Sequence, residues 1–124
     1  MLELNLKSKI QNKKYDLEGR TLKFSEKVFE YLDNLPKSIT HIEISKQLAR
    51  AAGSVGANYI EANESLGKKD CIMRIKISRK EAKEARYWLN LTKPKNEQLQ
   101  EKASLIKEST ELMNIFGAIL TKLS

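Results

Sequence analysis

The chain has 124 residues, 40% of them hydrophobic and 31% charged, and its formal net charge at pH 7 is +7. This length supports one domain with a single modest core, and no apolar run approaches the roughly 20 residues that a membrane-spanning helix needs. The first residues lack the apolar segment of a secretory signal, and the single cysteine, Cys71, cannot form an internal disulfide. We therefore expect a cytoplasmic protein with no membrane partner.

The first fifteen residues differ from the rest of the chain. Leu2, Leu4 and Leu6 alternate with polar residues, and four lysines follow before residue 15. We expect residues 1–15 to form an N-terminal arm, either extended against a neighbour or disordered. We expect residues 16–124 to form one helical domain.

The helical domain begins with two segments whose apolar residues recur at the period of an α-helix. The first begins after Asp16, a favourable N-cap residue, and is stopped by Pro36. The second opens at Thr40, which is spaced from Glu43 as in a capping box, and ends at Leu66-Gly67.

Two further segments follow with the same period. The third runs from about Lys69 to Leu91, and Lys93-Pro94-Lys95 forms the turn after it. The fourth runs from Asn96 to Leu123. Its main apolar stripe comprises Leu99, Ala103, Ile106, Thr110, Met113, Gly117 and Leu120. Its second apolar line comprises Leu105, Leu112, Phe116, Ile119 and Leu123.

Four helices joined by short connections predict an all-α fold, an antiparallel up-down-up-down four-helix bundle. The apolar residues of the stripes alternate between steps of three and four, which favours shallow crossing angles. No segment carries a convincing strand pattern.

Small and polar residues occupy two further faces of the second segment. The small face would let a neighbouring helix backbone come close; it comprises Ser45, Ala49, Ala52, Gly56 and Asn63. Beside the core lies a polar line of Gln47, Arg50, Ser54, Asn58 and Glu61. This line is either a set of interhelical hydrogen bonds that fix register or a site for a ligand or nucleic acid. We favour the first interpretation, because polar groups beside a core usually serve packing specificity.

The excess positive charge is concentrated in one part of the chain. Residues 68–95 contain ten basic and three acidic residues, whereas the remainder is balanced. A helical projection gathers five basic side chains in one arc, Lys76, Arg79, Lys80, Lys83 and Arg86. Such an arc is either a solvated helix face or a surface for phosphate backbones, and Tyr87 stands beside it as a stacking partner.

The opposite flank of the third segment carries Met73, Ile77 and Trp88. A bundle helix needs one apolar stripe, so these residues either widen the core or form a subunit interface. Tryptophan with aliphatic neighbours and mixed charges is a common interface composition, and we expect an oligomer interface here.

The sequence indicates no catalytic, metal or cofactor site. His41 is the only histidine and has no glutamate three residues before it, so the Glu-x-x-His pairs of a di-iron bundle are missing. Cys71 falls on a core position, where cysteine acts as a small hydrophobe. We expect a non-enzymatic protein without cofactors; an enzyme built around Glu61 and Arg50 is a weaker alternative.

A family resemblance rests on two segments. One is Gln47-Leu-Ala-Arg-Ala-Ala-Gly-Ser-Val-Gly-Ala-Asn-Tyr-Ile-Glu61, and the other runs from Arg74 to Leu89 and includes Glu81, Glu84, Tyr87 and Trp88. With these segments the chain resembles a bacterial four-helix-bundle family encoded in intervening sequences of 23S ribosomal RNA genes, often labelled S23 ribosomal proteins.

That resemblance implies a bundle that assembles as a ring, typically a homopentamer. It also implies kinship with the basic accessory protein of diversity-generating retroelements, which binds nucleic acid and its reverse transcriptase. The characteristic Ser, Asn and Glu of the family fall on Ser54, Asn58 and Glu61, and no catalytic residue is carried over. Many relatives have glycine at the position of Ala62 or Asn63, and its absence suggests a subgroup.

Two functions are compatible with these patterns. In the first, a non-enzymatic homo-oligomeric bundle contacts RNA or DNA phosphates through the basic arc, with little reading of sequence. In the second, the protein is a protein–protein interaction scaffold that binds no nucleic acid, and its positive charge steers a partner or adds solubility.

Overall fold

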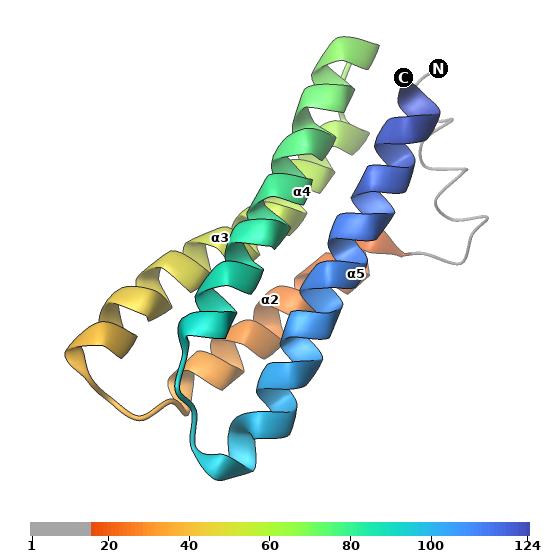
Figure 1. Cartoon of the computed structure of the whole chain (residues 1–124). Coiled ribbons are helices and arrows are strands. Elements are labelled where there is room, and N and C mark those ends of the chain that lie inside the picture. Colours follow the sequence, from red (N-terminus) through yellow and green to blue (C-terminus); the bar gives the residue numbers. More distant parts are fainter. Residues whose placement is uncertain (1–15) are drawn as a thin grey trace.

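The computed structural model describes residues 16–124, and this part of the chain is built from helices without strands (Figure 1). The elements are α2 (Leu17–Asp33), α3 (Ile39–Asn63), α4 (Lys68–Leu91), the short 3-10 helix η1 (Asn96–Gln98) and α5 (Leu99–Leu123). The predicted all-α class with four long helices is confirmed for these residues. The predicted arm, residues 1–15, lies outside the described part of the chain.

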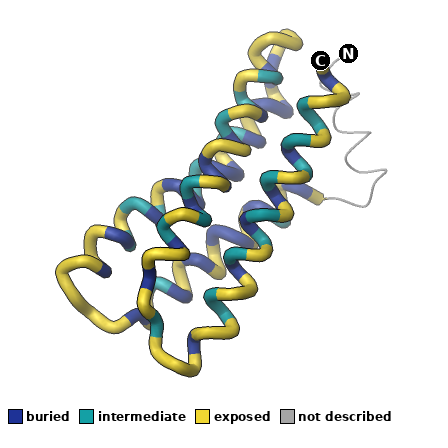
Figure 2. Tube along the Cα trace, viewed as in Figure 1, coloured by how far each residue is buried: buried dark blue, intermediate teal, exposed yellow. Residues whose placement is uncertain are grey.

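The four long helices pack around one core. Helix α4 packs against both α3 and α5, while α2 packs against α3 and, less extensively, against α5 (Figure 1). Buried residues recur along each helix (Figure 2). The largest fully buried side chains are those of Tyr31, Phe24, Phe116, Leu17, Leu48 and Ile75. Since burial of each such side chain contributes about 1.5–3 kcal/mol, this shared cluster is what holds the helices together.

In α5 the two apolar lines have roles that differ from the expectation. The buried residues of α5 are Leu105, Ser109, Leu112, Phe116 and Leu123. Four of these five belong to the predicted second line, whereas the main stripe is exposed at Leu99 and Ala103 and half-buried elsewhere. The main stripe includes small and polar members that carry little apolar area. Turning Leu112 and Phe116 inward therefore buries more apolar surface.

Local capping chemistry sets the helix starts. Asp16 is the N-cap of α2 as predicted, and its Oδ1 accepts a backbone N–H three residues on at 2.9 Å. The predicted capping box at Thr40 is wrong, because the N-cap of α3 is Ser38, two residues earlier, and the helix begins at Ile39. The Ser38 hydroxyl accepts the backbone N–H of His41 at 3.0 Å. Serine caps a helix as well as threonine does, so the helix gains two residues by starting at the earlier cap.

The remaining boundaries shift by a few residues. Helix α2 ends at Asp33, three residues before Pro36. Helix α3 ends at Asn63, short of the predicted stop, and Gly67 is the N-cap of α4. The predicted fourth helix starts with the 3-10 turn η1 before continuing as α5.

The small face of α3 allows a close helix neighbour, as the sequence predicted, and the structure identifies that neighbour as α2. A Cβ placed on Gly56 would lie 2.8 Å from Thr21 Oγ1 and 3.2 Å from Thr21 Cβ, closer than packed atoms allow. The Ser25 hydroxyl donates to the Ala52 carbonyl at 2.9 Å. Glycine is therefore required at position 56 for the backbones of α2 and α3 to approach this closely.

One end of the domain is closed by hydrogen bonds that the helical patterns did not indicate. His41 Nε2 accepts the Lys93 backbone N–H at 3.0 Å, and His41 Nδ1 lies 2.6 Å from the Pro36 carbonyl oxygen. An accepting Nε2 places the ring proton on Nδ1, which donates to Pro36. Nearby, the Tyr31 hydroxyl lies 2.6 Å from Thr92 Oγ1. His41 therefore ties the α2–α3 connection to the α4–α5 connection and has a structural role.

Candidate nucleic-acid interface

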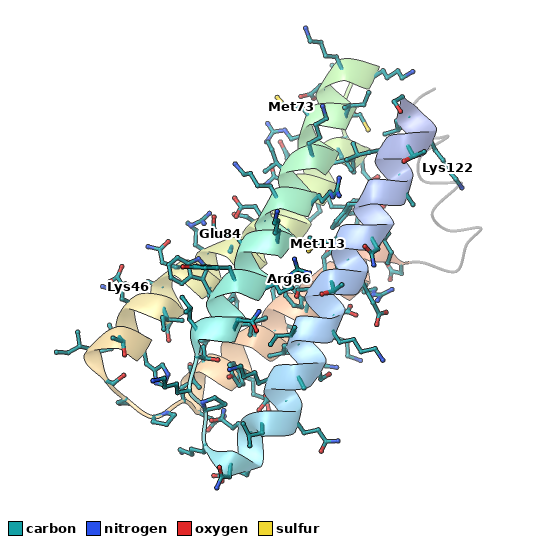
Figure 3. All side chains as sticks on the ribbon, in the orientation of Figure 1. Lys46, Met73, Glu84, Arg86, Met113 and Lys122 are labelled. Carbon is teal, nitrogen blue, oxygen red and sulfur yellow. The ribbon has the colours of Figure 1, made fainter. Side chains whose placement is uncertain are left out.

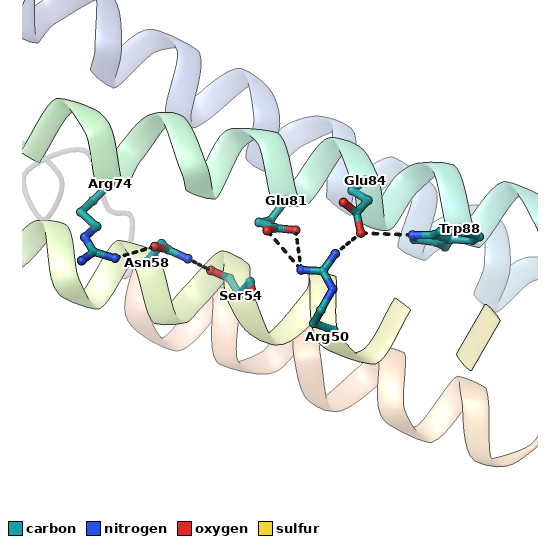
Figure 4. Close-up of polar contacts among 7 residues, drawn as sticks. All are labelled: Arg50, Ser54, Asn58, Arg74, Glu81, Glu84 and Trp88. Atoms are coloured by element: carbon teal, nitrogen blue, oxygen red, sulfur yellow. Dashed lines mark hydrogen bonds and ion pairs between the residues drawn. The ribbon is translucent and has the colours of Figure 1, made fainter. Parts of the chain in front are cut away.

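The polar line of α3 meets the acidic residues of α4 at Arg50 (Figure 4). Arg50 Nη1 donates to both Glu81 carboxylate oxygens at 3.3 Å, and Nη2 donates to Glu84. Glu84 Oε2 also accepts the indole N–H of Trp88 at 3.2 Å. Glu81 is only 8% exposed. Its hydrogen bond raises the pKa of the Arg50 guanidinium, and a carboxylate buried to this extent requires such a partner.

A second contact of the polar line lies two turns further along α3 (Figure 4). Asn58 Nδ2 donates to the Ser54 carbonyl at 2.9 Å, and Asn58 Oδ1 accepts from Arg74 Nη1 of α4 at 3.1 Å. Gln47 is half-buried and Glu61 is exposed, and neither side chain has a hydrogen-bond partner within residues 16–124. The structure thus joins Arg50 and Asn58 to α4 and leaves the two ends of the line outside this network.

The basic face of α4, Lys76, Arg79, Lys80, Lys83 and Arg86, divides into two groups. The two arginines contact α5: Arg86 Nη1 donates to Thr110 Oγ1 at 3.1 Å, and the Arg79 guanidinium lies beside Gly117. Figure 3 shows Arg86 on the α5 side of α4 and Glu84 on the α3 side. The three lysines are exposed and make no ion pair with any residue between 16 and 124.

Two carboxylates of α5 are directed away from this basic face. Glu108 accepts from Arg20 Nε at 2.7 Å and from Arg20 Nη2 at 2.8 Å, and Glu111 accepts from Nη2 at 3.0 Å. The bonds to Glu108 raise the pKa of the Arg20 guanidinium well above its ordinary value. Because Arg20 belongs to α2, these negative charges lie at the α2–α5 contact and do not neutralise α4.

The predicted interface residues Met73, Ile77 and Trp88 differ in exposure. Met73 is 47% exposed, whereas Ile77 and Trp88 are half-buried and Trp88 packs against the core. Beside them Tyr87 is 57% exposed and meets Trp88 edge to face, with ring centroids 5.1 Å apart. Other exposed large apolar side chains, which the sequence patterns did not single out, include Leu22, Phe29, Ile42 and Ile60.

The remaining chemistry-bearing residues form no reactive cluster in the described part of the chain. Burial raises the pKa of the Cys71 thiol, which keeps it neutral and a poor nucleophile. Between residues 16 and 124, no three His, Cys, Asp or Glu side chains gather as a metal site, and no helix could cross a bilayer. A surface pocket of about 270 Å³ between α2 and α5 is lined by the Arg20 ion pairs and by three lysines, Lys23, Lys27 and Lys107.

Comparisons with known proteins agree with this architecture. A solved structure from Bacteroides thetaiotaomicron, a protein with unknown function from the S23 ribosomal protein family, is 28% identical to this chain. The match covers 83% of this chain and 96% of that one, with a TM-score of 0.70. No curated protein matches. The family model of the 23S rRNA-intervening sequence protein matches residues 13–118, and the chain therefore belongs to that family.

Proposed function

We propose that this protein is a non-enzymatic, cytoplasmic four-helix bundle that contacts the phosphate backbone of RNA or DNA through the basic face of α4. The observation that carries the proposal is the arrangement of charge around α4. Glu81 and Glu84 are held by Arg50 on the α3 side, while Lys76, Lys80 and Lys83 are exposed without a described carboxylate partner.

A surface of this kind fits phosphates better than a specific partner of mixed charge. The ammonium group of a flexible lysine can bind a phosphate of the nucleic-acid backbone from many directions. Each phosphate that is neutralised in this way releases a condensed counterion. The two arginines at the edge of the face add planar donors suited to phosphate oxygens. Contacts of this type position a nucleic acid without reading its sequence.

The test is a charge reversal with a matched control. Lys80→Glu/Lys83→Glu reverses two charges on the basic face, and Lys23→Glu/Lys27→Glu reverses two exposed lysines on α2. By fluorescence anisotropy with labelled RNA and DNA, we expect the first variant to lose more than about tenfold in affinity and the second to stay within about threefold. Five phosphate contacts also predict a loss of roughly 100- to 500-fold between 50 and 200 mM salt for the unchanged protein.

Equal binding by both double variants would contradict the assignment to α4. Far-ultraviolet circular dichroism of each variant serves as the folding control. Absence of any nucleic-acid binding by the unchanged protein would refute the proposed function altogether.

We further propose that the helices run antiparallel, up-down-up-down, and that the chain assembles into a homo-oligomeric ring, with a pentamer as the expected size. Exposed Met73 and its neighbours Ile77 and Trp88 support this, because a ring larger than a dimer needs an apolar surface on each copy that meets a different surface on the next. A ring would repeat the basic face in every subunit and increase the field that attracts nucleic acid.

Light scattering tests the assembly directly. We expect the unchanged chain to have several times the mass of the monomer and the variant Met73→Glu/Ile77→Glu to fall to lower mass. A monomeric unchanged protein would refute the ring. The ultraviolet absorbance ratio of gently purified protein, measured on the same sample, reports bound nucleic acid.

The second candidate function is a protein–protein interaction scaffold without nucleic-acid binding. The exposed apolar side chains on α2 and α3, Leu22, Phe29, Ile42 and Ile60, favour it, because such residues are enriched where proteins dock. Recovery of an acidic protein partner from cells, with the nucleic-acid assay negative, would select this function.

A further inference from the structure

We propose that the nucleic acid recognised by α4 is single-stranded and that one of its bases stacks on Tyr87. This inference rests on the proposed function and specifies the form of the ligand. The observation that supports it is that Tyr87 is exposed, lies in line with the lysines of α4 and is held in place by Trp88. A further observation is that α4 lies between two other helices.

Tyr87 stands at the end of a line of lysines on the outer surface of α4. The lysine line comprises Lys69, Lys76, Lys80 and Lys83, and the steps from one member to the next and on to Tyr87 are seven, four, three and four residues. These steps keep all five side chains on one face of a helix. All five are exposed, and the distance along the axis from Lys76 to Tyr87 is about 16 Å. A nucleic-acid strand whose phosphates bind the lysines in turn would therefore reach the Tyr87 ring.

The Tyr87 ring is held by its neighbour and remains accessible. It is 57% exposed, and it meets the Trp88 ring at an interplanar angle of 75°. Trp88 is fixed in turn by its hydrogen bond to Glu84 and by packing against the core. An edge-to-face contact of this kind orients the tyrosine and leaves ring surface open to solvent. A positioned aromatic face beside positive charge is the combination that binds unpaired bases.

The helices on either side of α4 disfavour recognition of bases in the groove of a double-stranded nucleic acid. The major groove of B-DNA, about 12 Å wide, admits one helix, and the deep major groove of duplex RNA is too narrow for side chains to read. Helix α4 is flanked by both α3 and α5, whose axes in such packing lie about 8–10 Å away. Entry of α4 into a groove would therefore bring its neighbours against the phosphate backbone. On a duplex only phosphates would be reached, and Tyr87 would have no base face to contact, whereas a single strand presents its bases.

The experiment compares an unstructured twelve-nucleotide RNA with the duplex of the same sequence, using anisotropy at constant salt. For the unchanged protein we expect tighter binding of the single strand. Tyr87→Ala and Tyr87→Leu should each weaken single-strand binding about five- to tenfold, and Tyr87→Phe should stay within about twofold, because stacking requires the ring and not the hydroxyl or apolar bulk alone. Duplex affinity should change less than twofold in all three variants. Leu91→Ala, which shortens an exposed apolar side chain one turn further along α4, is the matched control and should bind normally.

The outcomes separate this inference from the function on which it rests. If single strand and duplex bind equally and Tyr87→Ala binds as well as Tyr87→Phe, while Lys80→Glu/Lys83→Glu abolishes binding, the backbone function stands and the single-strand inference is overturned. If the unchanged protein binds neither RNA, both are overturned. If Tyr87→Ala alters the oligomer mass in light scattering, Tyr87 belongs to a subunit contact and the inference likewise fails.

Discussion

The two flanks of α4 use similar residues in opposite ways. On the side of α3, Arg50 is bonded to two carboxylates, Glu81 and Glu84, and the contact is partly buried. On the side of α5, Arg86 is bonded to the neutral hydroxyl of Thr110 and to no other side chain of residues 16–124, and the lysines beyond it are exposed. One flank satisfies its charges within the molecule, and the other presents them to solvent.

This difference shows how a single helix can both hold a bundle together and offer a charged surface. Glu81 and Glu84 of α4 are placed where α3 supplies a cation, so they add to stability without reducing the positive charge on the far flank. Partner charges on the neighbouring helices, and not the composition of α4 alone, decide which of its charges remain free.

The largest expected effect comes from reversing the cation on the α3 side. Arg50→Glu would place a third carboxylate beside Glu81 and Glu84 and should lower the free energy of unfolding by about 2 kcal/mol. This is less than the loss of a fully buried pair, because Arg50 is half exposed. Arg86→Glu is the matched control on the other flank and should change stability by less than about 0.5 kcal/mol. Urea unfolding followed by circular dichroism measures both.

An equal loss from the two reversals would contradict the comparison between the flanks. Nucleic-acid binding should show the opposite order, with Arg86→Glu weakened and Arg50→Glu, where folded, nearly unchanged.

A smaller effect is expected from two helix glycines. Gly56→Ala would drive a Cβ into Thr21, which is 1% exposed and cannot easily move, and should destabilise the protein by about 1–2 kcal/mol. At Gly117, beside Arg79 on the basic flank, an added Cβ would find its nearest atom at 3.8 Å, an ordinary contact. Gly117→Ala should therefore stabilise by about 0.5–1 kcal/mol, as glycine replacement in a helix usually does.

Thermal and urea unfolding of both glycine variants report whether the α2–α3 contact is the tight one. If Gly117→Ala destabilised as much as Gly56→Ala, the basic flank would be as closely packed as the contact between α2 and α3.

The helical periodicity predicted the four helices and most of the core, because one apolar stripe per helix must be buried wherever the helix packs. It did not determine the rotation of α5. Either of the two apolar lines of α5 could face the core. Which line does so depends on the residues of the facing helices that pack against Leu112 and Phe116. The cap at Ser38 was missed for a related reason, since Ser38 and Thr40 are both adequate caps and only the packed position of α3 separates them.

The candidate site was predictable as a set of charges but not as a set of partners. A projection of α4 alone groups its basic residues, yet it cannot show that Arg50 pairs with Glu81 and Glu84 or that Arg74 donates to Asn58. These pairs join residues 16 to 34 positions apart on different helices. The structural role of His41 could not be predicted from the helical pattern either, because its bonds to Pro36 and Lys93 depend on two connections meeting at one end of the domain.

The smallest expected effect tests whether the exposed lysines serve folding at all. Lys76, Lys80 and Lys83 are spaced three or four residues apart, and like charges at that spacing destabilise a helix by about 0.2–0.5 kcal/mol per pair. Replacing all three with alanine should raise stability by about 0.5 kcal/mol more at low salt than at high salt, where the repulsion is already screened. Urea unfolding at two salt concentrations measures this, and the comparison between the two salt concentrations separates the repulsion from the higher helix propensity of alanine. A loss of stability in the triple variant would mean that the lysines hold the fold. A gain that is larger at low salt would mean that the chain retains a mutually repelling surface that its own folding does not need, which is the expected property of a surface that binds an external polyanion.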